Sequence, residues 1–154
     1  MICTSQTSND NAMGNKLKIC PAEGVDLGSI QFFDGSVQAG FPSPAEDHMD
    51  LDLDLSSYLI KHPSATFCVR VEGDSMVGAG IQSGDVILID RSLTPDRGSI
   101  VLAVIDGEFT VKRVDVVNDK LYLIPENPRL KPMEVAEESN FQVWGVVTFV
   151  IHKV

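Results

Sequence analysis

The stretch "SIVLAVIDGEFTVKRV" (residues 99–114) contains two apolar runs on either side of an Asp-Gly pair. Residues 99–105 and 108–114 are rich in Val, Ile, Phe and Thr, which are enriched in β-strands. Asp106-Gly107 lies between the two runs, and Asp-Gly is the strongest short hairpin signal because both residues tolerate the positive φ angles of a type I′ turn. The stretch therefore predicts an antiparallel β-hairpin.

Further segments of the same composition lie on both sides of this hairpin. Short strands separated by turn-forming residues predict an all-β domain, either a β-sandwich or an open barrel. One short helix is expected near residues 53–61, capped by an aspartate and ended by Pro63. The remaining expected strands are residues 66–72, 86–90, 120–126 and 141–153.

The composition is that of an ordinary globular protein with an acidic balance. The 154 residues are 44% hydrophobic and 22% charged, and the formal net charge is −10 at pH 7. This charge argues against direct binding to nucleic-acid phosphates, which requires clustered Lys and Arg. No apolar run approaches the ~20 residues of a membrane-spanning helix, so no membrane partner is expected. The N-terminus lacks a basic and apolar leader, which favours a cytoplasmic protein.

The cysteines do not suggest a structural framework. Cys3, Cys20 and Cys68 are too few and too scattered to predict a set of disulfides, and a reduced cytosol fits this usage. None of them lies in a CxxC pair, which argues against a zinc site. We expect no metal and no other cofactor.

The first forty residues differ in character from the rest. Residues 1–16 are polar with little periodicity, as in a loose arm. Residues 17–39 carry scattered apolar side chains and glycines, enough to lie against a surface and too few to fold alone. The segment "AGFPSPAEDHMD" (residues 39–50) combines a glycine with two prolines and predicts a linker. We therefore expect a flexible N-terminal arm ahead of the β domain.

Ser75, in "VEGDSM" (residues 71–76), is either a turn residue or a nucleophile. A nucleophilic serine needs a base to accept its proton. The three histidines are His48 in the linker, His62 beside a proline and His152 near the C-terminus, and none has a favourable setting. A Ser-His-Asp triad is therefore not indicated.

A lysine is the other group that can serve as the base, and Lys112 lies in the second arm of the expected hairpin. Strand alternation places Thr110, Lys112 and Val114 on one face. If that face points inward, loss of hydration lowers the lysine pKa, by up to ~3–5 units when burial is complete. A neutral amine then accepts the serine proton. A solvent-facing strand lysine is the ordinary alternative, and these residues alone leave both open.

Several ordered motifs resemble the LexA/UmuD family of self-cleaving serine–lysine peptidases. Gly73-Asp74-Ser75-Met76 matches the serine motif, and Thr110-Val111-Lys112-Arg113 matches the lysine motif, 37 positions further along the chain. Ala39-Gly40, in "VQAGFPSP", matches the upstream bond that such proteins cleave. The similarity extends from about residue 38 to the C-terminus.

The resemblance implies a role for each matched residue. Ser75 would be the nucleophile, Lys112 the general base, and the bond between Ala39 and Gly40 the substrate. The backbone N–H groups of Ser75 and Met76 would hold the oxyanion.

Within this family the chain resembles the UmuD branch. Only 39 residues, polar and rich in glycine, precede the cleavage motif, whereas a LexA-type repressor carries a helix-turn-helix there. One departure is an arm that is longer than usual for this branch. The resemblance implies two parts, an arm removed by self-cleavage (residues 1–39) and a Ser-Lys peptidase-like β domain (residues 40–154).

The resemblance also implies partners. A RecA–single-stranded-DNA filament would stimulate self-cleavage during the SOS response. The product would form a homodimer and join a Y-family, UmuC-like catalytic subunit in an error-prone translesion polymerase.

Three other functions compete with this interpretation. A non-catalytic dimerisation module would not need Ser75, Lys112 and Ala39-Gly40 all intact. A truncated LexA-like or phage-type repressor would need a DNA-binding domain elsewhere, and a signal peptidase would need a membrane anchor.

Overall fold

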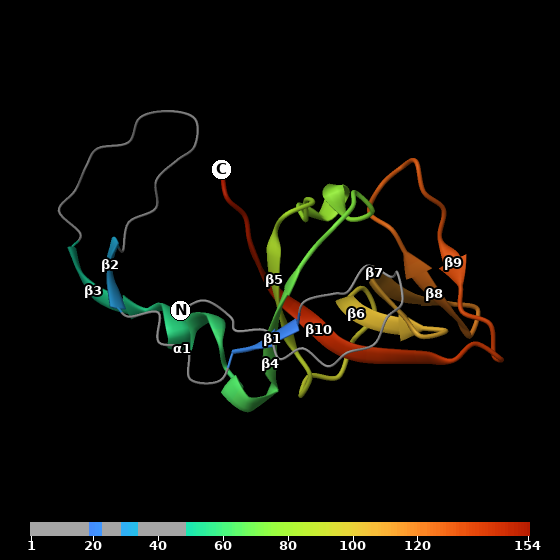
Figure 1. Cartoon of the computed structure of the whole chain (residues 1–154), viewed down its shortest axis with the longest axis horizontal. Coiled ribbons are helices and arrows are strands. Elements are labelled where there is room, and N and C mark those ends of the chain that lie inside the picture. The colour runs from blue at the N-terminus through green and yellow to red at the C-terminus, as the bar shows by residue number, and fades with distance from the viewer. Residues whose placement is uncertain (1–18, 23–28, 34–48) are drawn as a thin grey trace, which may run out of the picture. The chain divides into compact units, whose positions relative to one another are not determined.

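The computed structural model describes residues 19–22, 29–33 and 49–154 (Figure 1). The chain divides into two compact units. Of the described residues, the first unit contains 19–22 and 62–154, and the second contains 29–33 and 49–61.

The first unit is built on one antiparallel sheet of eight strands. Their order across the sheet is β1-β4-β5-β10-β6-β7-β8-β9. Two short 3-10 helices, η1 (Pro63–Ala65) and η2 (Val77–Ala79), accompany the sheet. The mainly β fold expected from the sequence is confirmed. The strands are β1 (Ile19–Pro21), β4 (Thr66–Arg70), β5 (Val86–Asp90), β6 (Ile100–Ile105), β7 (Glu108–Val117), β8 (Lys120–Ile124), β9 (Met133–Glu134) and β10 (Phe141–Ile151).

The hairpin expected at residues 99–114 is confirmed as β6 and β7. Ile105 pairs with Glu108 across the turn. The two turn residues, Asp106 and Gly107, have φ angles of 49° and 86°, as a type I′ turn requires. The hairpin places Lys112 opposite Val101 of β6, a residue with no exposed surface.

The long strand β10 holds the two halves of the sheet together. Its first part pairs with β6 and its last part pairs with β5, with register shifts between Val143 and Gly145 and between Val147 and Phe149 (Figure 1). Gly145 packs so closely that an added Cβ would lie 2.6 Å from the Ile89 side chain. A small residue is therefore needed where the strand passes from one neighbour to the other.

The core lies on both faces of the central strands. Leu102 belongs to one buried cluster and its neighbours Val101 and Ala103 belong to the other, as strand alternation requires. The first cluster also includes Met76, directly after Ser75. This cluster therefore anchors the loop between β4 and β5 that carries Ser75, which we call the serine loop. Its members are Val69, Val71, Met76, Ile81, Ile87, Ile89 and Leu102.

The second unit contains a strand pair that the sequence interpretation missed. β2 (Ser29–Phe33) pairs antiparallel with β3 (Met49–Asp54) in a separate two-stranded sheet. The helix expected near residues 53–61 is shorter, as α1 (Leu55–Leu59). Asp54 caps it by accepting a hydrogen bond from Ser57 N at 3.2 Å, which confirms the expected aspartate cap.

We predict that Gly145→Ala destabilises the protein by about 1–3 kcal/mol, because the new methyl group meets Ile89. Urea unfolding followed by tryptophan fluorescence measures the change. Gln142→Ala, at an exposed position of the same strand, is the matched control and should change the stability by less than ~0.5 kcal/mol. An equal loss in both variants would contradict the packing argument.

Candidate active site

Ser75 lies in a loop between β4 and β5 whose base is closed by hydrogen bonds. Val71 N donates to Asp85 O, and Gly84 N donates to Val71 O, both at 2.8 Å. The next residue after Ser75, Met76, is 2% exposed and packs in the core. Closure of the loop and burial of Met76 fix the position of the half-buried serine.

Lys112 reaches this loop from β7. Its Nζ lies 3.0 Å from Ser75 Oγ, 2.8 Å from Thr110 Oγ1 and 3.0 Å from Val111 O. An ammonium group has three N–H donors, so these three acceptors satisfy it. The contact between Thr110 and Lys112 confirms that both side chains lie on one face of the strand.

Burial lowers the pKa of Lys112 below its usual value, because the charged form loses hydration. A nearby carboxylate would oppose this shift by stabilising the ammonium. Within the described ranges, Lys112 forms no ion pair. The lysine is therefore set to lose its proton more readily than an exposed lysine.

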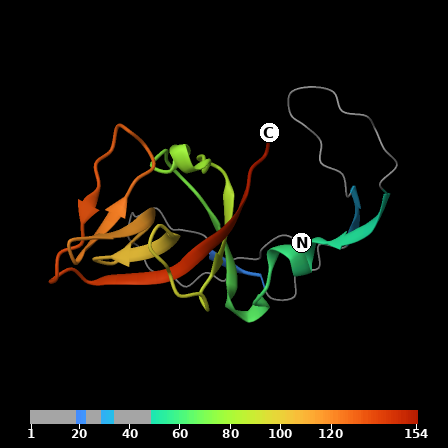
Figure 2. The same ribbon diagram turned by 180° about the vertical axis from the view of Figure 1, so that it is seen from behind.

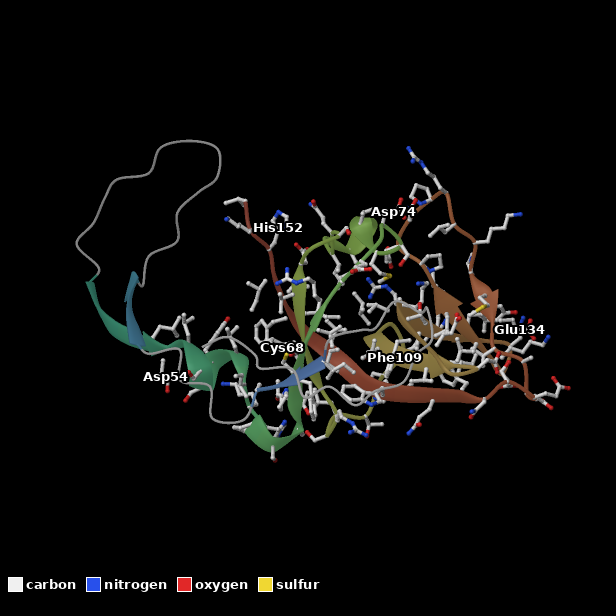
Figure 3. All side chains as sticks on the ribbon, in the orientation of Figure 1. Asp54, Cys68, Asp74, Phe109, Glu134 and His152 are labelled. Atoms are coloured by element: carbon white, nitrogen blue, oxygen red, sulfur yellow. The ribbon has the colours of Figure 1, made fainter. Side chains whose placement is uncertain are left out.

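A second loop supports the serine loop from the far end of β8. Asn127 Nδ2 donates to Asp74 O at 2.9 Å, and Gly78 N donates to Glu126 O at 2.6 Å. Asn127 is 7% exposed, and Figure 3 labels Asp74 in the loop that it holds. These two hydrogen bonds hold the serine loop on both sides of Ser75, at Asp74 and at Gly78.

Glu126 is held in turn by Arg113, the residue after Lys112. The Arg113 guanidinium pairs with the Glu126 carboxylate and also donates to Gly98 O at 2.6 Å. The supporting roles of Asn127, Glu126 and Arg113 were not predicted from the sequence. The one signal for them was the stretch "LIPENP" (residues 123–128), in which two prolines flank Glu126 and Asn127 and indicate a turn after a strand.

The histidines contact other groups. His62 Nδ1 lies 2.6 Å from Asp90 Oδ2, and His152 Nδ1 lies 2.7 Å from Asp85 Oδ1. His48 and the predicted cleavage site, Ala39-Gly40, lie outside the described residues. In the part of the chain that the structure describes, no cluster of His, Cys, Asp and Glu is arranged to hold a metal ion. No helix there is long and apolar enough to span a membrane.

Comparison with known proteins agrees with this architecture. The family model described as Peptidase S24-like matches residues 31–148, which include Ala39-Gly40, Ser75 and Lys112. The chain belongs to the peptidase S24-like family. Protein ImpA of Escherichia coli is 47% identical over 122 residues, covering 75% of this chain and 79% of that protein.

Other relatives place the chain among UmuD-like members of the peptidase S24-like family, which confirms the resemblance. Protein SamA of Salmonella typhimurium is 43% identical over 137 residues, 89% of this chain and 95% of that protein. Protein MucA of Escherichia coli is 43% identical over 121 residues, 78% of this chain and 82% of that protein. A LexA repressor of Oleidesulfovibrio alaskensis is 37% identical over 113 residues, but the match covers only 54% of that protein.

We predict that Asn127→Ala lowers the free energy of unfolding by about 1–3 kcal/mol, because the carbonyl of Asp74 loses its buried partner. Thermal and urea unfolding measure the loss. Asn140→Ala, at an exposed position just before β10, serves as the control and should be nearly neutral. Wild-type stability in Asn127→Ala would show that the second loop does not support the serine loop.

Proposed function

We propose that the protein is a self-cleaving serine–lysine peptidase whose substrate is its own Ala39–Gly40 bond. The single observation that carries the proposal is the 3.0 Å contact between Lys112 Nζ and Ser75 Oγ, in a setting that lowers the lysine pKa. Membership in the peptidase S24-like family supports the same chemistry. Cleavage separates residues 1–39 from residues 40–154.

The neutral amine suits the role of base. With one proton gone, Lys112 keeps two N–H donors and gains a lone pair. The two donors remain on Thr110 Oγ1 and Val111 O, and the lone pair turns toward Ser75 Oγ. This arrangement accepts the hydroxyl proton without moving the side chain.

Bond exchange then follows in two steps. Ser75 Oγ attacks the Ala39 carbonyl carbon while Lys112 takes the hydroxyl proton. The carbon–nitrogen bond breaks, Lys112 returns the proton to the leaving amine of Gly40, and Ala39 is left as an ester on Ser75. Water, deprotonated by the neutral lysine, hydrolyses the ester and frees the serine.

Backbone N–H groups just before η2 stabilise the negative oxygen that forms during attack. The N–H groups of Ser75 and Met76 donate no hydrogen bond to the described residues, so they remain available to the substrate. Preformed donors of this kind favour the transition state because they need no rearrangement.

We propose that cleavage activates a subunit of an error-prone translesion polymerase in the SOS response. The UmuD-like relatives support this role over that of a repressor. The match to this chain covers 79% of ImpA and 95% of SamA, but only 54% of the LexA repressor. A RecA–single-stranded-DNA filament stimulates cleavage, and residues 40–154 act as a homodimer with a Y-family catalytic subunit. The net charge of −10 suits a protein that leaves DNA contact to these partners.

Self-cleavage should accelerate as the pH rises from 7 to 10. At a pH below its pKa, Lys112 is charged and cannot accept a proton, whereas at a higher pH the amine is neutral and can. Burial lowers the pKa of Lys112, so the neutral form appears at a lower pH than for an exposed lysine. Mass spectrometry of the incubated full-length protein should find one cut, after Ala39. Ser75→Ala should abolish cleavage, as should Lys112→Arg, because arginine stays protonated.

Lys120→Arg is the matched control, because this exposed lysine pairs with Glu134 at 2.7 Å and should leave the rate unchanged. Continued cleavage in Ser75→Ala, or wild-type cleavage in Lys112→Arg, would refute the mechanism.

Thr110→Val should slow cleavage roughly tenfold, because the amine loses one of the acceptors that hold it beside Ser75. The ammonium form of Lys112 loses more hydrogen-bond stabilisation than the neutral amine, which lowers the pKa of Lys112 further. The midpoint of the pH–rate profile should therefore also move to lower pH. Thr148→Val is the control, since that hydroxyl binds Leu88 O at 3.3 Å. A slower rate with an unchanged pH midpoint would mean that Thr110 has only a packing role.

A further inference from the structure

Cys20 and Cys68 lie directly opposite each other where β1 pairs with β4. The register joins Ile19 to Val69, Cys20 to Cys68 and Pro21 to Phe67. β1 forms the edge of the eight-stranded sheet and pairs with β4, next to which it lies in Figures 1 and 2. Figure 3 labels Cys68 at this side of the sheet. Both residues are thiols of intermediate exposure.

Directly opposed residues on antiparallel strands have their side chains on the same face of the sheet. Ile19, one position earlier in β1, packs against the core cluster that contains Val69. Because alternate residues face opposite sides, the two cysteines lie on the other face, together. Neither side chain has to change faces of the sheet for the two sulfur atoms to meet.

The spacing of this pair suits a disulfide. Ala22 N donates to Thr66 O at 3.0 Å, so Ala22 and Thr66 form a hydrogen-bonded pair. Such pairs recur at every second position, which makes Cys20 and Cys68 a pair of the same kind, with Cα atoms roughly 5.5 Å apart. Disulfides span Cα separations of about 4.4–6.8 Å.

We propose that Cys20 and Cys68 form a reversible disulfide that fastens β1 to the edge of the sheet when the protein meets a peroxide. One thiolate attacks a peroxide oxygen, which gives a sulfenic acid and, after protonation, one water. The second thiol attacks the sulfenic sulfur, the S–S bond forms and another water leaves. In balance, two thiols and one hydrogen peroxide yield one disulfide and two waters.

The two thiols have different parts in this reaction. Burial raises the pKa of Cys68, so that thiol holds its proton more tightly than an ordinary cysteine. We assign the first oxidation to Cys20, because β1 is the edge strand of the sheet, and the resolving step to Cys68, on the neighbouring strand β4.

The bond has a consequence for activation that rests on the proposed function. Cys20 precedes Ala39-Gly40 in the chain and Cys68 follows it. In the oxidised protein, a cut between Ala39 and Gly40 would leave the arm attached through the disulfide, and the edge of β4 would stay covered. A thiol reductant would then release the arm, so that both cleavage and reduction are required.

Bond formation is tested in the full-length chain with Cys3→Ser, which leaves only these two cysteines. Hydrogen peroxide should lower the intact mass by about 2 Da, the two hydrogens lost, and a non-reducing peptide map should join Cys20 to Cys68. Cys20→Ser and Cys68→Ser in the same background are the matched controls and should show no such loss. Oxidation of both cysteines by added oxygen, with no joined peptide, would overturn the proposal.

The effect on the arm is tested without relying on self-cleavage. A recognition sequence for a site-specific protease is placed between Ala39 and Gly40 of the Ser75→Ala, Cys3→Ser chain. After protease treatment, the arm should stay attached to the oxidised protein on a non-reducing gel and be freed by a thiol reductant. Release of the arm from the oxidised protein as fast as from the reduced protein would contradict the proposal, whatever the outcome for self-cleavage.

Discussion

The contact between Lys112 Nζ and Ser75 Oγ sets the requirements that the surrounding structure meets. A lysine partly removed from water without a carboxylate partner is costly in its charged form. It is useful only if a hydroxyl group is held beside it. Two neighbouring acceptors, Thr110 Oγ1 and Val111 O, reduce the cost of burial and keep the amine aimed at the serine.

The two members of this pair come from different halves of the sheet. Ser75 lies on the loop between β4 and β5, and Lys112 lies on β7. β10 bonds to β5 in one half and to β6 in the other, and Gly145 lets it pass closely beside Ile89. Asn127 adds a direct tie between the halves, because it follows β8 and holds the carbonyl of Asp74. The geometry of the pair therefore depends on the whole sheet.

Local chemistry made part of this structure predictable. The Asp106-Gly107 turn and its flanking strands follow from residues adjacent in the chain, and so does the Asp54 cap. The association of Ser75 with Lys112 came from the resemblance to a family, since strand alternation alone left the lysine facing either way.

Contacts between residues that are far apart in the chain were not predicted from the sequence. The strand β3 was missed although "DLDLD" (residues 50–54) alternates with the period of a strand, because its partner β2 lies far away in the chain. Cys20 and Cys68 looked scattered for the same reason: only the pairing of β1 with β4 brings them together. The tie from Asn127 to Asp74 spans 53 positions and has no local signal.

The protonation state of Lys112 tests the central claim most directly. NMR titration of the lysine side-chain signals in the full-length Ser75→Ala protein, which cannot cleave itself by this mechanism, gives the pKa of Lys112. We predict a midpoint below the ~10.4 of an exposed lysine, because burial destabilises the ammonium. A midpoint at or above that value would contradict the proposal that Lys112 acts as the base for Ser75.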